Sequence, residues 1–308
     1  MKTLLMTLIA AFFALSCATP NPSAPSAPTA KAFDTPNDAA KALIEAAAAY
    51  DVPTLLGILG PDAKDLVASE DRAADQVRAQ EFTAKAREKH SVAVDPDGAH
   101  ATLTVGNDDW PLPIPMVLID GKWYFDTRAG RDEMLKRRIG ANELDAITIA
   151  RGYDEAQQEY AATVHDNSGV KQYAQRLISS PGKHDGLAWK NPDGSWGGPV
   201  GEEVAKGIEQ GFAKKGEPFH GYYFKILKGQ GPSARLGQLD YVVGGAMLGG
   251  FALIAWPAQY GVTGIQTFMV SYDGVVYQKD LGPDTTSIAP AIDRYDPNET
   301  WVRTEDDW

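Results

Sequence analysis

The loop between residues 183 and 203 carries the side chains best suited to chemistry, because acids, a histidine and tryptophans alternate there. Its relevant residues are His184, Asp185, Trp189, Trp196, Glu202 and Glu203. Paired carboxylates beside aromatic rings are what a glycosidase or a glycan-binding site needs. Tryptophans more often stabilise cores and loops. We therefore predict a binding surface made of His184, Asp185, Trp189, Trp196 and Glu202, and we assign no catalytic residue.

Metal binding is not predicted from the histidines. They are His90, His100, His165, His184 and His220, and no two are three or four residues apart. Neither H-E-x-x-H nor a paired-cysteine spacing occurs.

Calcium is the one metal for which the sequence offers a pattern. Asn191, Asp193, Ser195 and Glu202 stand at the first, third, fifth and twelfth positions of an EF-hand-like loop, but Trp196 replaces the required glycine. Asp280 and Asp284 in a C-terminal loop are a second calcium candidate. An exposed Asn-Pro-Asp-Gly turn explains the first pattern more simply, so we predict no metal and no cofactor.

Nucleophile and nucleotide motifs are incomplete. Ser195 lies in DGSWG, which lacks the first glycine of G-x-S-x-G. The glycine-rich stretches 229–237 and 242–250 have neither a following Lys-Ser/Thr nor a G-x-G-x-x-G spacing, so their glycines indicate turns between strands.

The N-terminus, MKTLLMTLIAAFFALSCATP, is typical of an export signal. Lys2 precedes an apolar run from Leu4 to Leu15 that is too short to span a bilayer comfortably. Cys17 is the only cysteine, and its position resembles that of the lipidated cysteine of a bacterial lipobox. We predict a signal peptide over residues 1–17 and lipidation of Cys17. Ordinary cleavage after Ser16-Cys17-Ala18 is the alternative.

Composition limits the partners. Residues 18–34 are rich in Pro, Ser and Ala and predict an extended tether.

The 308-residue chain is 44% hydrophobic, so it is long and apolar enough for two domains. Its net charge is −12. Since no segment is strongly basic, we exclude nucleic acid as a partner.

Residues 35–130 predict an α+β domain. Thr35 and Pro36 begin a helix, and helical spacing continues with interruptions to about His90. The pattern then alternates in two hairpins, the second of which turns at Asp120-Gly121. Helices followed by a curved antiparallel sheet resemble the cone-like fold of the nuclear-transport-factor-2-like superfamily.

Residues 141–308 predict a second α+β domain, with residues 129–140 as a connector or the start of the next helix. A long helix from Ala141 to about Val164 is followed by short helices near 170–178 and 201–214. Strands are expected at 220–227 and 250–257, and in a hairpin whose two-residue turn is Asp273-Gly274. One long helix on a small antiparallel sheet resembles the body of a pilin.

Four dense runs of sequence resemble one bacterial family over about residues 32–301. They are ANELDAITIARGYDEAQQEYA, KQYAQRLISSPGKHDGLAWK, FHGYYFKILKGQGPSA and MLGGFALIAWPAQYGVTGIQTFMVSYDGVVYQKDLGPDT. The family is the domain of unknown function 2950. The resemblance implies a secreted or lipid-anchored envelope protein and no particular activity.

These patterns favour a non-enzymatic envelope lipoprotein. The lipid anchor would attach it to a membrane, with the outer membrane favoured because Ala18 follows Cys17. The folded domains would then bind an envelope protein, peptidoglycan or a small molecule. The alternatives are a periplasmic hydrolase, with a site near His184–Glu203 or in the N-terminal cone, and a pilus-like assembly subunit.

Overall fold

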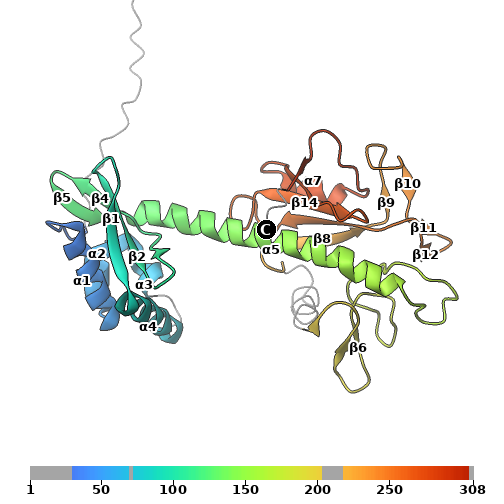
Figure 1. The fold of residues 1–308 in the computed structure, drawn as a ribbon, viewed down its shortest axis with the longest axis horizontal. Coiled ribbons are helices and arrows are strands. Elements are labelled where there is room, and N and C mark those ends of the chain that lie inside the picture. The colour runs from blue at the N-terminus through green and yellow to red at the C-terminus, as the bar shows by residue number, and fades with distance from the viewer. Residues whose placement is uncertain (1–29, 69–71, 203–217, 305–308) are drawn as a thin grey trace, which may run out of the picture. The chain divides into compact units, whose positions relative to one another are not determined.

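The computed structural model describes residues 30–68, 72–202 and 218–304 (Figure 1). The chain divides into two compact units, Met1–Arg131 and Asp132–Trp308, and the boundary falls inside helix α5 (Thr127–Ala161). Helices and antiparallel sheets make up both units, which confirms the α+β class. In the described ranges no helix has the length and apolar character needed to cross a membrane.

Two helices of the first unit, α1 and α2, begin at side-chain caps, and the sequence predicts the first of these caps. Thr35 precedes α1 (Pro36–Ala48), and its Oγ1 accepts a hydrogen bond of 3.1 Å from the backbone N–H of Asp38. Asp51 caps α2 (Val52–Leu59) in the same way. The remaining helical elements are the 3₁₀ turn Pro61–Ala63, α3 (Lys64–Val67) and α4 (Arg72–Glu88).

One antiparallel sheet completes the first unit. Its strands run in the order β1-β2-β4-β5, with β3 paired to β2. They are β1 (His90–Val94), β2 (His100–Val105), β3 (Trp110–Pro111), β4 (Met116–Ile119) and β5 (Lys122–Phe125). Asp120 and Gly121 have φ angles of 49° and 76°, so the predicted tight turn between β4 and β5 is confirmed.

Helix α5 begins at Thr127, well before the predicted start at Ala141. The side chain of Asp126 accepts a hydrogen bond of 2.9 Å from the N–H of Ala129, which satisfies a free donor of the first turn. The Thr127 hydroxyl donates to the carbonyl of Leu59. The expected connector over 129–140 is therefore helical throughout, which is one of the two outcomes that the sequence left open.

A five-stranded antiparallel sheet is the centre of the second unit. The strand order is β16-β15-β14-β13-β8, and β13 is buried along its whole length, as its apolar sequence predicts. The strands are β8 (Tyr222–Leu227), β13 (Ala252–Pro257), β14 (Gln266–Ser271), β15 (Tyr277–Asp280) and β16 (Val302–Arg303). The β14–β15 turn differs from the prediction, because only Gly274, and not Asp273, has a positive φ, and the ladder closes at Met269 and Tyr277.

Smaller elements surround this sheet. Three two-stranded hairpins pair β6 (Trp189–Lys190) with β7 (Trp196–Gly197), β9 (Gly229–Gln230) with β10 (Leu239–Asp240), and β11 (Val242–Val243) with β12 (Ala246–Met247). A short helix, α7 (Thr285–Ala291), contacts β13.

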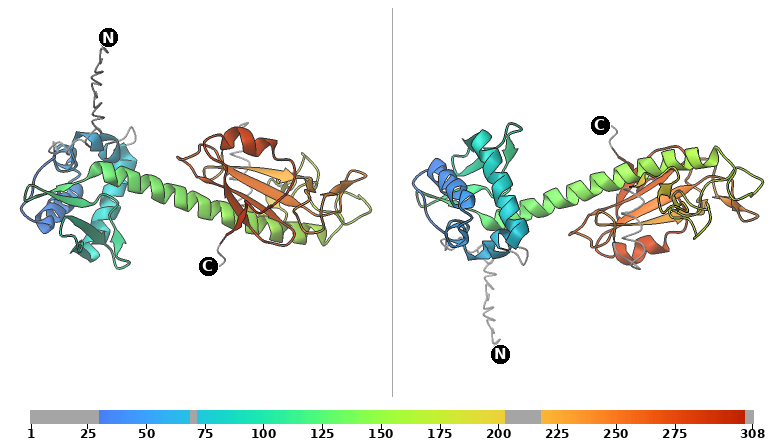
Figure 2. Two further views of the ribbon diagram at one scale, coloured as in Figure 1. Left: turned by 90° about the horizontal axis from the view of Figure 1, so that it is seen from above. Right: turned by 90° about the horizontal axis from the view of Figure 1, so that it is seen from below.

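The second half of α5 lies along this sheet (Figure 2) and belongs to its core. Ala146, Ala150, Tyr153, Ala156 and Tyr160 form a buried stripe with helical spacing. The predicted end of the stripe, Val164, is 48% exposed because the helix stops at Ala161.

The segment 165–188 has no helix, so the short helix expected near 170–178 is wrong. Its backbone groups pair instead with Met247 and with each other across the segment. The N–H of Tyr173 donates to Met247 over 2.9 Å, and the carbonyls of Arg176 and Leu177 accept from Leu187 and Ala188. Because these groups are satisfied by non-helical partners, the segment gains nothing from helical pairing.

One buried side chain on α5, that of Gln157, holds this irregular segment. Its Oε1 accepts from the N–H of Ala174 at 2.8 Å, and its Nε2 donates to the Ala174 carbonyl and the Tyr153 hydroxyl, both at 2.9 Å. Gln157 has no exposed surface. The side-chain amide of Gln157 therefore pairs with both backbone groups of Ala174, as a neighbouring strand would.

We predict that Gln157→Leu lowers the free energy of unfolding by about 2–4 kcal/mol, because it leaves both backbone groups of Ala174 buried and unpaired. Urea unfolding followed by circular dichroism measures the change. Gln158→Leu, on the exposed side of the same helix, is the matched control and should cost under about 1 kcal/mol. Equal losses in the two variants would contradict the role given to Gln157.

Candidate functional site

The predicted binding loop contains the hairpin β6–β7, and this hairpin separates its two tryptophans. Trp189 lies opposite Gly197, whereas Trp196 lies opposite Lys190. Neighbouring register positions point to opposite faces of a ladder, so the two indoles do not form one aromatic surface. Gly197 is required here, since a Cβ at this position would lie 2.6 Å from the indole Nε1 of Trp189.

His184 and Trp189 do come together. Their ring centroids are 4.4 Å apart, and the His184 backbone accepts a hydrogen bond of 2.5 Å from the Tyr160 hydroxyl. The His184 N–H donates to Asp166 over 2.8 Å, while its Nδ1 is 3.9 Å from the same carboxylate. The main chain of His184 is therefore fixed, and its ring is held mainly by contact with an indole.

Asp185 has a structural partner. Its carboxylate accepts from the N–H and the hydroxyl of Ser180 at 2.7 and 2.8 Å, and the Nε of Arg176 is 3.7 Å away. Partial burial raises the pKa of Asp185, but the Ser180 hydrogen bonds and the Arg176 charge outweigh it and hold the pKa below its ordinary value. A carboxyl that stays ionised in this way is unsuited to act as a general acid.

The remaining predicted residues do not converge with these. Trp196 lies under the Lys190 ammonium, which is 5.1 Å from its ring centroid, and Glu202 is exposed. Glu203 and Cys17 lie outside the described residues.

The EF-hand-like positions form a turn closed by its own side chains. Asp193 accepts from the N–H and hydroxyl of Ser195 at 2.9 and 2.6 Å, and Asn191 donates to the same hydroxyl over 3.0 Å. This is the exposed polar turn that the simpler interpretation predicts.

A second polar cluster is exposed in the first unit. Potential ligand atoms of Asp95, Asp97 and His100 lie within 4.8 Å of one another. Asp97 is already hydrogen-bonded to His100 and to the N–H of Ala99 in the β1–β2 turn. These contacts account for the cluster as part of the turn.

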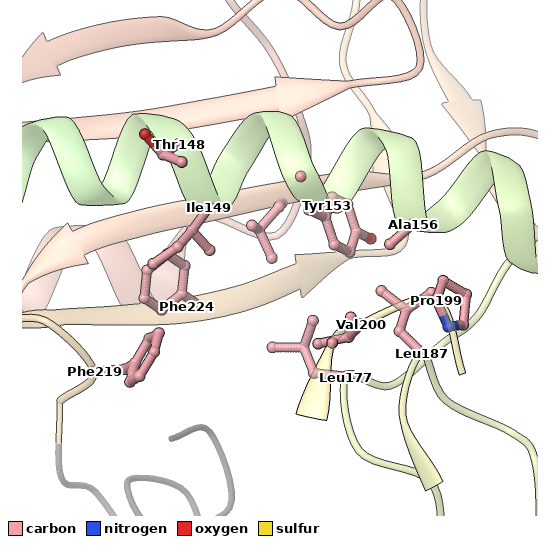
Figure 3. A pocket seen from close by; sticks show the side chains of 13 residues that line it. Thr148, Ile149, Tyr153, Ala156, Leu177, Leu187, Pro199, Val200, Phe219 and Phe224 are labelled. Atoms are coloured by element: carbon pink, nitrogen blue, oxygen red, sulfur yellow. The ribbon is translucent and has the colours of Figure 1, made fainter. Parts of the chain in front are cut away.

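The structure also contains an apolar cavity of about 280 Å³ in the second unit (Figure 3). One wall is α5, a second is formed by β8 and β13, and the irregular segment around Leu177 and Leu187 closes the third. The lining residues are Thr148, Ile149, Gly152, Tyr153, Ala156, Leu177, Leu187, Pro199, Val200, Gly201, Phe219, Phe224 and Leu253.

None of the described residues that line the cavity carries a group ready for acid–base or nucleophilic chemistry. Their one ionisable side chain is that of Tyr153, whose hydroxyl accepts from Gln157 and donates to the Ala252 carbonyl over 3.4 Å. Burial raises the pKa of Tyr153 far above its ordinary value, so it stays neutral. The Thr148 hydroxyl donates to Leu144 within the helix. The described lining is therefore chemically suited to hold an apolar group.

Sequence reasoning did not find this cavity, because its walls come from distant parts of the chain. Gly152 was the one available signal. It is a glycine inside an amphipathic helix, and a Cβ built on it meets no atom within 4 Å.

Comparison with known proteins gives one match. A family model described as "Protein of unknown function (DUF2950)" matches residues 30–304. No curated protein and no solved structure matches the chain. The likenesses to nuclear-transport-factor-2-like proteins and to pilins consequently remain predictions.

For Asp185→Asn we predict a loss of about 1 kcal/mol in unfolding free energy at pH 7, because the charged hydrogen bonds from Ser180 weaken. Because the pKa of Asp185 is lowered in the folded protein, its ionised carboxylate stabilises the fold at pH values above 3.8, the ordinary pKa of an aspartate. This stabilisation is lost as the pH falls through the folded-state pKa. The difference in unfolding free energy between Asp185→Asn and the wild type should therefore become smaller below about pH 4.

Urea titrations at several pH values measure this gap. Glu159→Gln, at an exposed acid on α5, is the control and should change the unfolding free energy at pH 7 by less than about 0.5 kcal/mol. A gap that widened on acidification would refute the assignment.

Proposed function

This chain belongs to the DUF2950 family of proteins of unknown function, and we propose that it is a non-enzymatic cell-envelope lipoprotein whose second unit binds a small apolar molecule. The observation that carries the proposal is the cavity of about 280 Å³ between α5, β8 and β13. Its volume is close to the lower end of the range for small-molecule sites, about 300–1,000 Å³.

Burial of apolar surface supplies the affinity in this proposal. Leu177, Val200 and Phe219 are only partly buried in the protein itself, so a ligand that covers them removes apolar surface from water. Each buried methylene group contributes about 0.8 kcal/mol. The wall that α5, β8 and β13 form belongs to the buried core of the second unit, so this wall is in place before a ligand binds.

Binding is favoured over hydrolysis in the second unit because neither the cavity nor the 183–202 region assembles a reactive set among the described residues. The cavity lining contains no carboxylate and no histidine. In the 183–202 region, Asp185 is committed to Ser180, and the two tryptophans point apart.

The cell-envelope location rests on the N-terminal sequence. Lys2, the apolar run that ends at Leu15, and Cys17 support export and lipidation, and the Pro-, Ser- and Ala-rich residues 18–34 support a tether. A protein held at a membrane in this way has lipid molecules as the nearest source of apolar ligands.

We predict that Gly152→Leu reduces binding of N-phenyl-1-naphthylamine, a neutral apolar fluorophore, by at least about tenfold. The added side chain enters open space in the cavity. Fluorescence titration measures the affinity. Gly140→Leu is the matched control, because Gly140 is also in α5 and has open space at its Cβ, yet does not line the cavity.

Both substitutions should raise helix stability similarly, by about 0.8 kcal/mol, so a difference in binding reports the cavity and not the fold. Failure of the wild-type protein to bind the fluorophore would overturn the proposal. So would equal binding by the two variants.

For the lipid anchor, we predict that cells supplied with radioactive palmitate label the wild-type chain but not Cys17→Ala. Cys17 is the only cysteine, so no other thiol is available for acylation. Label is read after immunoprecipitation and gel electrophoresis. Equal label in both proteins would exclude lipidation at Cys17.

A further inference from the structure

The apolar cavity adjoins a second depression that carries a cation. This depression has a volume of about 420 Å³ and shares Leu177 and Phe224 with the cavity lining. Gln175 and Arg176 also line it. From this junction we propose that the ligand is an anionic amphiphile, with its apolar chain in the cavity and its carboxylate or phosphate head group on Arg176. The inference rests on the proposed function and names its ligand class.

A third, polar depression of about 490 Å³ shares Gln175 and Arg176 with the second depression. Lys228 and the carboxylate of Asp185 line it as well, and Asp185 already accepts two hydrogen bonds from Ser180. The lining thus changes from apolar at Tyr153 and Leu253 to polar and charged at Arg176 and Lys228, which is the order of groups along an amphiphile.

Arg176 has hydrogen-bonding capacity to spare. Its side chain is 60% exposed, and within the described ranges its ionic partner is Asp185, at 3.7 Å from Nε. Both oxygens of that carboxylate already accept from Ser180. The terminal N–H groups of a guanidinium bind an oxyanion in a planar, bidentate geometry, so a head group can join without breaking the Asp185–Ser180 contact.

The neighbouring cation in the second depression is already engaged. The Nζ of Lys225 donates to the Pro290 carbonyl at 2.6 Å and to Asp293 at 3.0 Å. The depression therefore offers a head group one available cation, Arg176, rather than a diffuse positive patch.

The main chain places Arg176 with little freedom. Its carbonyl accepts from Leu187 at 3.1 Å, and the side chain of the preceding Gln175 donates to the Gly245 carbonyl at 2.7 Å. Gln157 fixes Ala174, two residues earlier. The cation is thus held beside the apolar cavity before any ligand arrives, which lowers the entropic cost of binding.

The test is displacement of N-phenyl-1-naphthylamine by dodecanoate, dodecyl phosphate and the neutral dodecanol. We expect the two anions to compete more strongly than the alcohol. Arg176→Gln should weaken the anions about fivefold, the effect of an exposed charged contact, and leave dodecanol unchanged. Arg176→Lys should restore part of the anion preference. Lys171→Gln, which removes an exposed charge from the same segment outside the three depressions, is the control and should match wild type.

The outcomes separate the two proposals. Dodecanol that competes as well as the anions, or an unchanged anion affinity in Arg176→Gln, would overturn the head-group assignment and leave the apolar-ligand proposal standing. A wild-type protein that does not bind the fluorophore overturns both. A preference of the wild type for dodecyl phosphate supports the assignment and indicates a phospholipid-type head group, and a preference for dodecanoate supports it and indicates a fatty acid.

Discussion

The attachment of segment 165–188 to α5 in the second unit depends on a buried amide. Gln157 takes the place of a missing strand and satisfies both backbone groups of Ala174 from the face of α5. A buried peptide group without a partner costs about 1–3 kcal/mol, so this contact decides whether the irregular segment 165–188 stays against the helix. Tyr153, which also bonds Gln157, links the same amide to the central strand β13.

The cavity follows from this arrangement. A regular helix or strand in place of the irregular segment would bring a continuous row of side chains against α5 and fill the space. The segment instead contributes Leu177 and Leu187 from separate turns, and Gly152 leaves a gap on the helix face. The same segment puts Arg176 beside Leu177, at the edge of the cavity. An apolar volume and a cation therefore lie next to each other because Arg176 and Leu177 are neighbours in the chain and Leu177 lines both depressions.

Several groups that look reactive in the sequence have structural partners. Asp185 is bonded to Ser180, Asp193 to Ser195, and His184 is packed on Trp189. Each of these contacts stabilises a turn or a loop. Polar side chains whose hydrogen bonds hold a loop in this way are not available to activate a substrate. For this reason we propose the cavity, and not the carboxylates, as the functional site.

The sequence by itself determined the elements whose causes are local, together with the family and the α+β class. The Thr35 cap, the Asp120-Gly121 turn and the all-apolar strand β13 were all predicted, because each depends on residues within a few positions of one another. The sequence left open whether residues 129–140 form a connector or the start of the next helix, and contacts of Asp126 and Thr127 begin α5 at Thr127. The absence of a helix at 170–178 and the divergence of Trp189 from Trp196 were decided by pairings across the fold. The cavity belongs to that second group, since Gly152, Val200 and Leu253 meet only after the chain folds, and no spacing along a sequence specifies the volume left between side chains from different elements.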